Sequence, residues 1–261
     1  MTPPLIEEGA LFRIGESALL QGGLLHAGGI VRRGALSPEE ILRARAALPS
    51  EHAATWTRLW ALEWLIAKTA GHEPIAQTIA GVVEDCAECR LADGGGLSAR
   101  AQAERGCAIA VVPLAGAGGQ FPGVAALLLS STRSGDPPDA RAIWEGANEF
   151  PPIAGVRLDS IVCPPNMAHG FIGRSWQLAA ALAARALREG SARARLNLAA
   201  DWLVTGEVTP DGTVRPVELG NKIRLPRSGR RWLVPAGPKI PDELIAQGYA
   251  RARSAEVAWN Q

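Results

Sequence analysis

Ser175 and Lys222 are the two residues of this sequence whose side chains could together carry out nucleophilic chemistry. A serine hydroxyl is a poor nucleophile and needs a neighbouring base. A lysine amine becomes such a base when burial lowers its pKa, because desolvation disfavours the ammonium form. The neighbours of Lys222 are mostly apolar, and the nearest acid is Glu218. The pair therefore predicts acyl transfer by a serine nucleophile with a lysine general base.

Each residue also has a simpler interpretation. Ser175 begins an Ala/Leu-rich segment that predicts a helix over 175–188, and serine is a common N-cap residue. The backbone N–H groups at this helix start would also suit an oxyanion. A lone Lys222 would be a surface lysine in most proteins. His169, six residues before Ser175, is a competing base, although a loop histidine is the simpler interpretation; Asp159 and Asp201 are nearby acids without a clear role.

The order of the motifs around the pair is more specific than either residue alone. Gly173-Arg174-Ser175 opens the helix, and the motifs that follow it are Thr205-Gly206-Glu207-Val208, Asp211-Gly212-x-Val214-x-Pro216-Val217, Lys222 and a strand that ends at Leu233-Val234-Pro235. In order and spacing this series resembles the proteolytic domain of the Lon proteases. The resemblance covers roughly residues 106–258, and its specific matches lie within 173–235.

The resemblance implies a Lon-type proteolytic domain in which Ser175 is the nucleophile, Lys222 is the general base and Thr205 orients the lysine amine. It implies no cofactor and no metal. The sequence departs from the family at Trp176, a bulky residue directly after the nucleophile, which would narrow or reshape the site. The family's ATPase module is not recognisable in these 261 residues.

We therefore expect an ATP-independent, Lon-like serine endopeptidase that cuts exposed segments of a protein substrate. One dedicated partner, in a regulated bacterial stress or defence response, is the narrower version of this hypothesis. The alternative is a catalytically inactive Lon-like protein-interaction module. Neither version specifies the cleavage-site preference or the activating signal, and both allow an oligomer.

The composition excludes several other classes of protein. The chain has 27 Lys and Arg against 26 Asp and Glu, and 47% of its residues are hydrophobic. It is therefore too apolar to be disordered, and it has no net field to hold nucleic acid. No apolar run reaches the roughly 18 residues of a membrane span. Two glutamates near the N-terminus argue against an export signal, so we expect a cytoplasmic protein.

The four cysteines predict neither a disulfide framework nor a complete metal site. Cys86-x-x-Cys89 has the spacing of half a zinc site, but no second ligand pair follows at metal-binding spacing. Cys107 and Cys163 stand alone in the sequence. Small, half-buried side chains in a reducing compartment are the simpler interpretation.

Periodicity and turn residues predict an α+β fold in two parts. Gly94-Gly95-Gly96 divides a mainly helical N-terminal accessory region, 1–105, from a peptidase domain, 106–261. Residues 1–35 are expected as short strands or loops. Helices are expected over 37–48, 53–69, 74–91, 175–188, 221–225 and 242–252. Strands are expected over 107–114, 124–131, 156–163, 201–208, 213–217 and 232–235.

Trp56, Trp60 and Trp64 form a stripe on the expected helix over 53–69, because they recur at every fourth position. The simpler interpretation of the stripe is a core face. The alternative is a docking ridge for a dedicated partner, since tryptophan is enriched at interface hot spots. In either case the stripe precedes every candidate catalytic residue, so we expect this region to control access and to do no chemistry.

Overall fold

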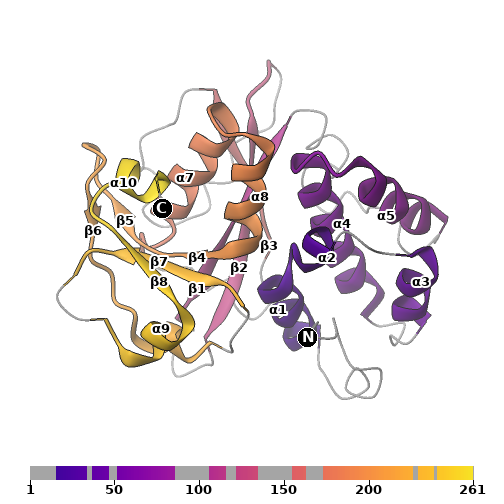
Figure 1. Cartoon of the computed structure of the whole chain (residues 1–261), viewed down its shortest axis with the longest axis horizontal. Helices are drawn as coiled ribbons and strands as arrows, with labels where there is room; N and C mark the ends of the chain where they lie inside the picture. Colours follow the sequence, from indigo (N-terminus) through magenta and orange to yellow (C-terminus); the bar gives the residue numbers. More distant parts are fainter. Residues whose placement is uncertain are drawn as a thin grey trace.

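The chain folds around a six-stranded mixed sheet with helices on both faces (Figure 1), so the expected α+β class is confirmed. The computed structural model describes residues 16–33, 37–46, 52–85, 106–115, 122–134, 155–162, 173–225, 229–237 and 240–260. The helices are α1 Glu16–His26, α2 Gly29–Arg33, α3 Pro38–Ala46, α4 Ala53–Thr69, α5 Glu73–Asp85, α7 Gln177–Arg188, α8 Ala192–Asp201, the 3₁₀ helix η7 Gly220–Arg224, α9 Asp242–Gln247 and α10 Ala255–Trp259.

The strands of the large sheet lie in the order β3-β2-β1-β4-β7-β8. Antiparallel pairing joins β1 to β2 and β2 to β3, whereas β1, β4, β7 and β8 run parallel to one another. A separate antiparallel pair is made by β5 and β6. The strand bounds are β1 Cys107–Leu114, β2 Gly123–Ser131, β3 Val156–Val162, β4 Trp202–Val204, β5 Glu207–Val208, β6 Val214–Arg215, β7 Arg231–Pro235 and β8 Tyr249–Ala252.

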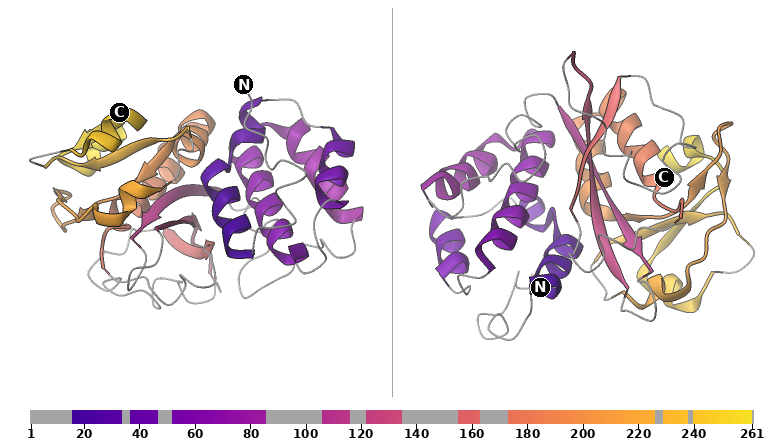
Figure 2. Two further views of the ribbon diagram at one scale, coloured as in Figure 1. Left: turned by 90° about the horizontal axis from the view of Figure 1, so that it is seen from below. Right: turned by 180° about the vertical axis from the view of Figure 1, so that it is seen from behind.

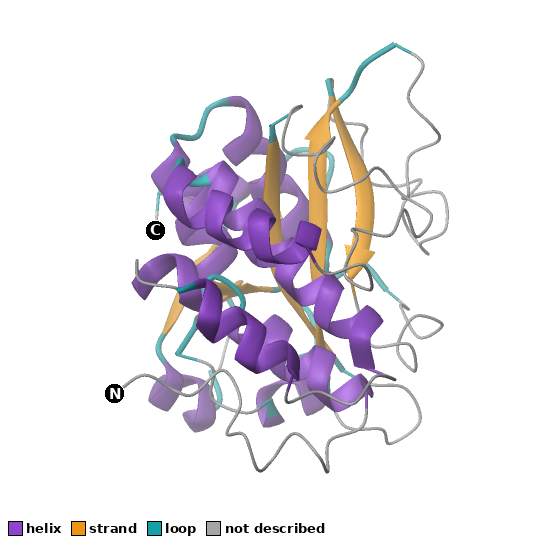
Figure 3. Cartoon of the chain, turned by 90° about the vertical axis from the view of Figure 1, so that its right-hand side faces the viewer, coloured by secondary structure: helices purple, strands orange, loops and turns teal. Residues whose placement is uncertain are grey.

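Both faces of the sheet are buried, each in its own apolar core. Alternate residues of β1 point to opposite faces, with Ile109 and Val111 in one core and Ala110 and Val112 in the other. The N-terminal helices cover the first face, and α7 and α10 cover the second (Figure 2). In Figure 3 the N-terminal helices lie in front of the strands that they cover. The N-terminal helices therefore share one apolar core with the sheet, and α7 and α10 share a second core with its opposite face.

Several elements have the bounds expected from the sequence to within a few residues. α4 and β1 have the expected bounds, and β1 pairs with β2 as a hairpin. α3 begins with a capping box, in which Ser37 Oγ accepts a hydrogen bond from the Glu40 N–H and the Glu40 carboxylate accepts one from the Ser37 N–H. The expected boundary between the two parts falls on 86–105, which lie outside the described residues.

Other predictions are wrong, and tertiary packing explains each one. Residues 16–33 form α1 and α2 where strands or loops were expected. A Cβ added at Gly23 would lie 2.4 Å from Leu59 Cδ2, so this glycine serves close helix packing and does not mark a turn. The last predicted helix ends at Gln247, because Gly248 has φ 81° and the next four residues pair with β7 as strand β8.

The predicted strand over 201–208 is in fact two strands in different sheets. β4 belongs to the large sheet, and β5 pairs with β6. The residues between them turn away, because the Gly206 N–H donates to the Ser175 carbonyl. α8 was not predicted at all; the Ser191 side chain caps it by accepting from the Ala194 N–H.

The tryptophan stripe is a core face. Trp56 and Trp60 are buried, with ring centroids 5.4 Å apart, and Trp64 is partly buried against the same core. The alternative of a docking ridge is wrong for Trp56 and Trp60, because neither side chain is accessible to a partner. In the part of the chain that the structure describes, no helix combines the length and apolarity needed to cross a bilayer.

Glu63 of α4 is a buried carboxyl at the junction between the N-terminal helices and the sheet. One of its oxygens accepts a hydrogen bond of 2.7 Å from the Gly28 N–H. Burial raises the pKa of this carboxyl to about 7, against the opposing effects of that hydrogen bond and of the Arg230 guanidinium. Glu63 therefore keeps its proton in the folded protein at pH values where the unfolded chain has lost it.

We expect Glu63→Gln to change how stability depends on pH. Between about pH 4.5 and pH 7 the wild-type free energy of unfolding falls as pH rises, because only the unfolded state releases the proton. Glutamine does not titrate, so the stability of the variant relative to wild type should rise across this window, by at most about 3 kcal/mol. Urea unfolding of both proteins at pH 5 and pH 8 measures the difference in their free energies of unfolding. The exposed control Glu243→Gln should show no such trend; a difference for Glu63→Gln that is independent of pH would contradict the expectation.

Candidate active site

Ser175, Thr205 and Lys222 come together although they lie on three separate segments. The Lys222 amine lies 2.9 Å from Ser175 Oγ and 3.1 Å from Thr205 Oγ1. Ser175 lies in the turn before α7, Thr205 follows the end of β4, and Lys222 lies within η7. All three predicted residues therefore meet at one place in the fold.

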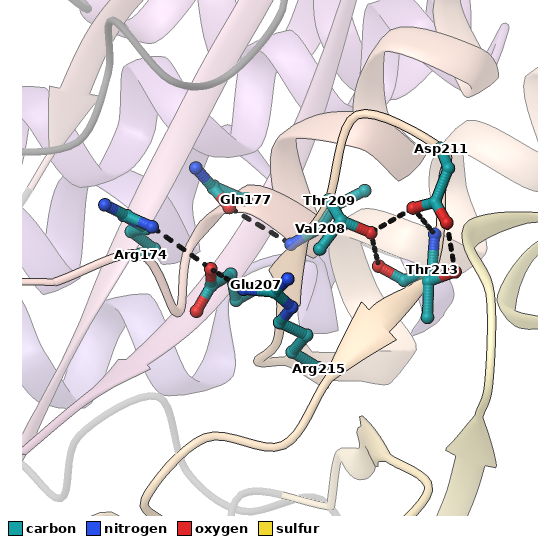
Figure 4. Close-up of polar contacts among 8 residues, drawn as sticks. All are labelled: Arg174, Gln177, Glu207, Val208, Thr209, Asp211, Thr213 and Arg215. Carbon is teal, nitrogen blue, oxygen red and sulfur yellow. Dashed lines mark hydrogen bonds and ion pairs between the residues drawn. The ribbon is translucent and has the colours of Figure 1, made fainter.

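Backbone hydrogen bonds hold the start of α7 against the segment that carries Thr205. The Gly206 N–H donates to the Ser175 carbonyl at 2.8 Å, and the Leu178 N–H donates to the Gly206 carbonyl at 2.9 Å. The buried Gln177 side chain accepts from the Val208 N–H at 3.0 Å (Figure 4). These contacts place the serine beside the threonine.

The interpretation of Ser175 as an ordinary N-cap is wrong in this structure. The N-cap position of α7 belongs to Trp176, which makes no side-chain capping bond. The hydroxyl of Ser175 contacts the Lys222 amine instead. The Trp176 side chain is 2% exposed and packs into the core under α7, a position in which it supports the helix start.

Lys222 is an unusual lysine because its side chain is 5% exposed. Leu219 and Ile223, which flank it, pack against the core, as the apolar neighbourhood in the sequence predicted. Burial lowers the pKa of the Lys222 amine to about 8, and the exposed Glu218 carboxylate acts in the opposite direction. An appreciable fraction of this amine is therefore neutral near physiological pH.

The hydrogen bonds around the amine orient it toward the serine. The Thr205 hydroxyl donates to the Ser175 carbonyl at 3.4 Å, so its single proton is directed away from Lys222. Toward the amine, Thr205 Oγ1 acts as an acceptor. A neutral Lys222 can thus donate one N–H to Thr205 and direct its lone pair at the Ser175 hydroxyl. This arrangement can remove a proton from the serine.

A second group of polar residues surrounds the hairpin beside the site. The Glu207 carboxylate lies 3.3 Å from the Arg174 guanidinium and 3.8 Å from that of Arg215 (Figure 4). At the tip of the hairpin, Asp211 accepts from the Thr213 N–H and from the Thr209 hydroxyl. These bonds close the turn between β5 and β6, and the ion pairs link the start of α7 to both strands.

Of the remaining candidate residues, the structure describes only some. His169, Cys86, Cys89 and Cys163 lie outside the described residues. Asp201 forms an ion pair with Arg32, and Asp159 lies on β3. Cys107 is a buried free thiol. Within the described ranges, no three His, Cys, Asp or Glu side chains are grouped so that they could hold a metal ion.

Two residues that shape the site were not singled out by the sequence. Gln177 gave no signal, because its role depends on a backbone group 31 positions away. Gly206 was noted only as part of a motif. An added Cβ there would lie 3.0 Å from Leu178 Cδ2 and 3.1 Å from Val214 Cγ1. The glycine therefore allows the backbone after β4 to approach α7 and β6 closely.

Comparisons with known proteins add no relative. No family model, no curated protein and no solved structure matches the chain.

Gly206→Ala tests the close approach that holds the site together. The added methyl group must displace Leu178 or Val214, so we expect a loss of about 1–3 kcal/mol in the free energy of unfolding. The matched control is Gly81→Ala on α5, where an added Cβ meets nothing within 4 Å and alanine favours the helix by up to about 1 kcal/mol. Urea unfolding of both variants measures the difference. Equal stability of Gly206→Ala and wild type would show that this contact is not tight.

Proposed function

We propose that this protein is an ATP-independent, Lon-like serine endopeptidase with a Ser175–Lys222 dyad. The observation that carries the proposal is the 2.9 Å contact between the buried Lys222 amine and the Ser175 hydroxyl. Burial of an ammonium group costs free energy, so a lysine with a purely structural role is normally exposed to solvent. The burial of Lys222 against a serine hydroxyl therefore favours a catalytic role. The order of the sequence motifs supports a Lon-type proteolytic domain.

In the first half-reaction, neutral Lys222 takes the Ser175 proton while Oγ attacks the carbonyl carbon of a peptide bond. The tetrahedral intermediate collapses as the lysine ammonium gives that proton to the leaving amine, and an acyl-enzyme ester remains. In the second half-reaction, Lys222 takes a proton from water, and the resulting hydroxide attacks the ester. The lysine then returns the proton to Ser175, and the carboxylic acid product leaves.

The oxyanion requires donors that the fold has not already used. The N–H groups of Gln177 and Leu178, at the helix start, donate to the carbonyls of Arg174 and Gly206. In the ranges that the structure describes, the Ser175 N–H has no acceptor. We therefore assign the Ser175 N–H as an oxyanion donor in place of the first helical N–H groups.

The proposed substrate of such an enzyme is an exposed or flexible protein segment. A dedicated partner that docks on the N-terminal helices belongs to the same proposal. The contact would involve faces other than Trp56 and Trp60, which are buried. We propose a cytoplasmic location, with no nucleic acid or membrane among the partners.

Ser175→Ala tests the nucleophile. We expect wild type to cleave an unfolded, fluorescently labelled casein and to form a covalent adduct at Ser175 with a small fluorophosphonate, detected by mass spectrometry. The variant should do neither yet stay folded, because its hydroxyl caps no helix. Retained cleavage in the pure variant would contradict the assignment. If wild type neither cleaves nor forms the adduct, the inactive interaction module is the better description.

Lys222→Arg tests the base. Arginine keeps the positive charge but cannot accept a proton near neutral pH, so we expect it to be as inactive as Lys222→Ala. In wild type, hydrolysis should rise with pH through a midpoint near 8, because the amine must be neutral to act. The pH profile of adduct formation measures this midpoint. Substantial activity in Lys222→Arg would make Lys222 a charge partner and not a base.

A further inference from the structure

The buried Arg230 joins the N-terminal helices to the sheet and has no part in the chemistry above. Its side chain is 2% exposed, and its guanidinium donates to five backbone carbonyls. Three of these carbonyls, those of Leu24, Leu25 and Ala27, lie at the end of α1, with distances of 2.6–3.5 Å. The other two, at 2.6 and 3.2 Å, belong to Ala199 and Trp202.

These carbonyls come from the C-terminal ends of two helices. The last carbonyls of a helix have no partner within it and carry the negative end of the helix dipole. Arg230 fills this role for α1 and for α8, whose C-cap residue is Trp202. Burial lowers the pKa of the guanidinium only to about 9, so it stays charged at neutral pH. One cation therefore caps both helices.

The same contact lies at the start of β4 and β7, the two strands that pair just before Thr205. Arg230 directly precedes β7, and Trp202 is the first residue of β4. The two strands pair in register from Trp202 and Arg231 onward. Three residues later the Thr205 N–H donates to the Leu233 carbonyl at 3.0 Å, and its hydroxyl meets Lys222. The guanidinium and the site are therefore about 10 Å apart along one short strand.

The turn after α1 is held just as closely. Gly28 has φ 85°, and an added Cβ would lie 2.5 Å from the Ala200 Cβ at the end of α8. Its N–H is taken by the buried Glu63 of α4. The Arg32–Asp201 ion pair joins α2 to α8 beside it. The turn after α1 is thus packed closely against the end of α8, directly before β4.

We infer that Arg230 is a positioning residue, through which the placement of α1 sets the geometry of Thr205 and Lys222. The catalytic consequence rests on the proposed function, but the positioning itself does not. A lysine at 230 could not reproduce it, because a single ammonium cannot reach the ends of two helices and a strand in fixed directions. In this inference, displacement of α1 loosens β4 and so shifts Thr205. Water then enters beside Lys222, and the hydrogen bond from its amine to Thr205 Oγ1 is lost.

The test measures the Lys222 amine directly. The chain has only three lysines, Lys68, Lys222 and Lys239, so lysine-selective ¹³C labelling gives three side-chain NMR signals, and Lys222→Arg assigns the one of interest. In wild type this signal should titrate near pH 8. The Lys68 amine, which pairs with Glu73 on the surface, is an internal control that should not respond to Arg230.

Arg230→Lys and Gly28→Ala perturb the contact from its two sides. In both variants we expect the Lys222 titration to move toward the ordinary lysine value by about one pH unit. We expect hydrolysis of a short unstructured peptide at pH 7.5 to fall about tenfold or more. The matched control is Gly71→Ala in the turn after α4. It imposes similar backbone strain, at φ 73°, but its Cβ meets nothing within 4 Å, so the Lys222 titration should not move.

Each outcome decides one of the two claims. An unmoved Lys222 signal in folded Gly28→Ala overturns the inference, even where Arg230→Lys fails to fold. Equal shifts in Gly28→Ala and Gly71→Ala also overturn it, because they would show a general loss of stability. A shift confined to Gly28→Ala and Arg230→Lys supports it. If wild type shows the expected titration but no peptide hydrolysis, the proposed function fails and the positioning role stands.

Discussion

The arrangement of this protein depends on a buried cation, the Arg230 guanidinium, which donates to five backbone carbonyls. Arg230 cannot give up its charge near neutral pH, so the carbonyls at the ends of α1 and α8 must stay around it. Leaving that charge without partners would cost several kcal/mol. The N-terminal helices and the sheet therefore share one core, and α1 supplies three of the five carbonyls that accept from the guanidinium.

Lys222 is also a buried basic residue, but unlike Arg230 it can lose its charge. It meets two hydroxyls, those of Ser175 and Thr205, and apolar side chains, so its amine can lose its proton near pH 8. Arginine at this position would remain charged. The two buried basic residues thus divide their roles according to their chemistry: the guanidinium stabilises the architecture, and the amine supplies a titratable base.

The candidate site lies at the end of β4, the strand that connects the helix end capped by Arg230 to the Thr205 that contacts Lys222. β4 has three residues, and it connects the capped end of α8 to Thr205. On its other side, main-chain hydrogen bonds of Gly206 and the Gln177 side chain, which accepts from the Val208 N–H, hold the start of α7, so Ser175 is not placed by a capping bond of its own. The positioning role proposed for Arg230 rests on this short strand, because β4 lies between the capped end of α8 and Thr205.

Local chemistry was readable from the sequence: the apolar stripe predicted α4, and residue type and motif order made Ser175 and Lys222 the candidate pair. The sequence could not determine that 249–252 would form β8, because the free edge of β7 supplies those hydrogen bonds. Only the tertiary structure brought Lys222 to Ser175 and Arg230 to two helix ends. Contacts between residues far apart in the chain produce no periodic pattern in the sequence. Their free energy comes from burial, which exists only after the chain has folded.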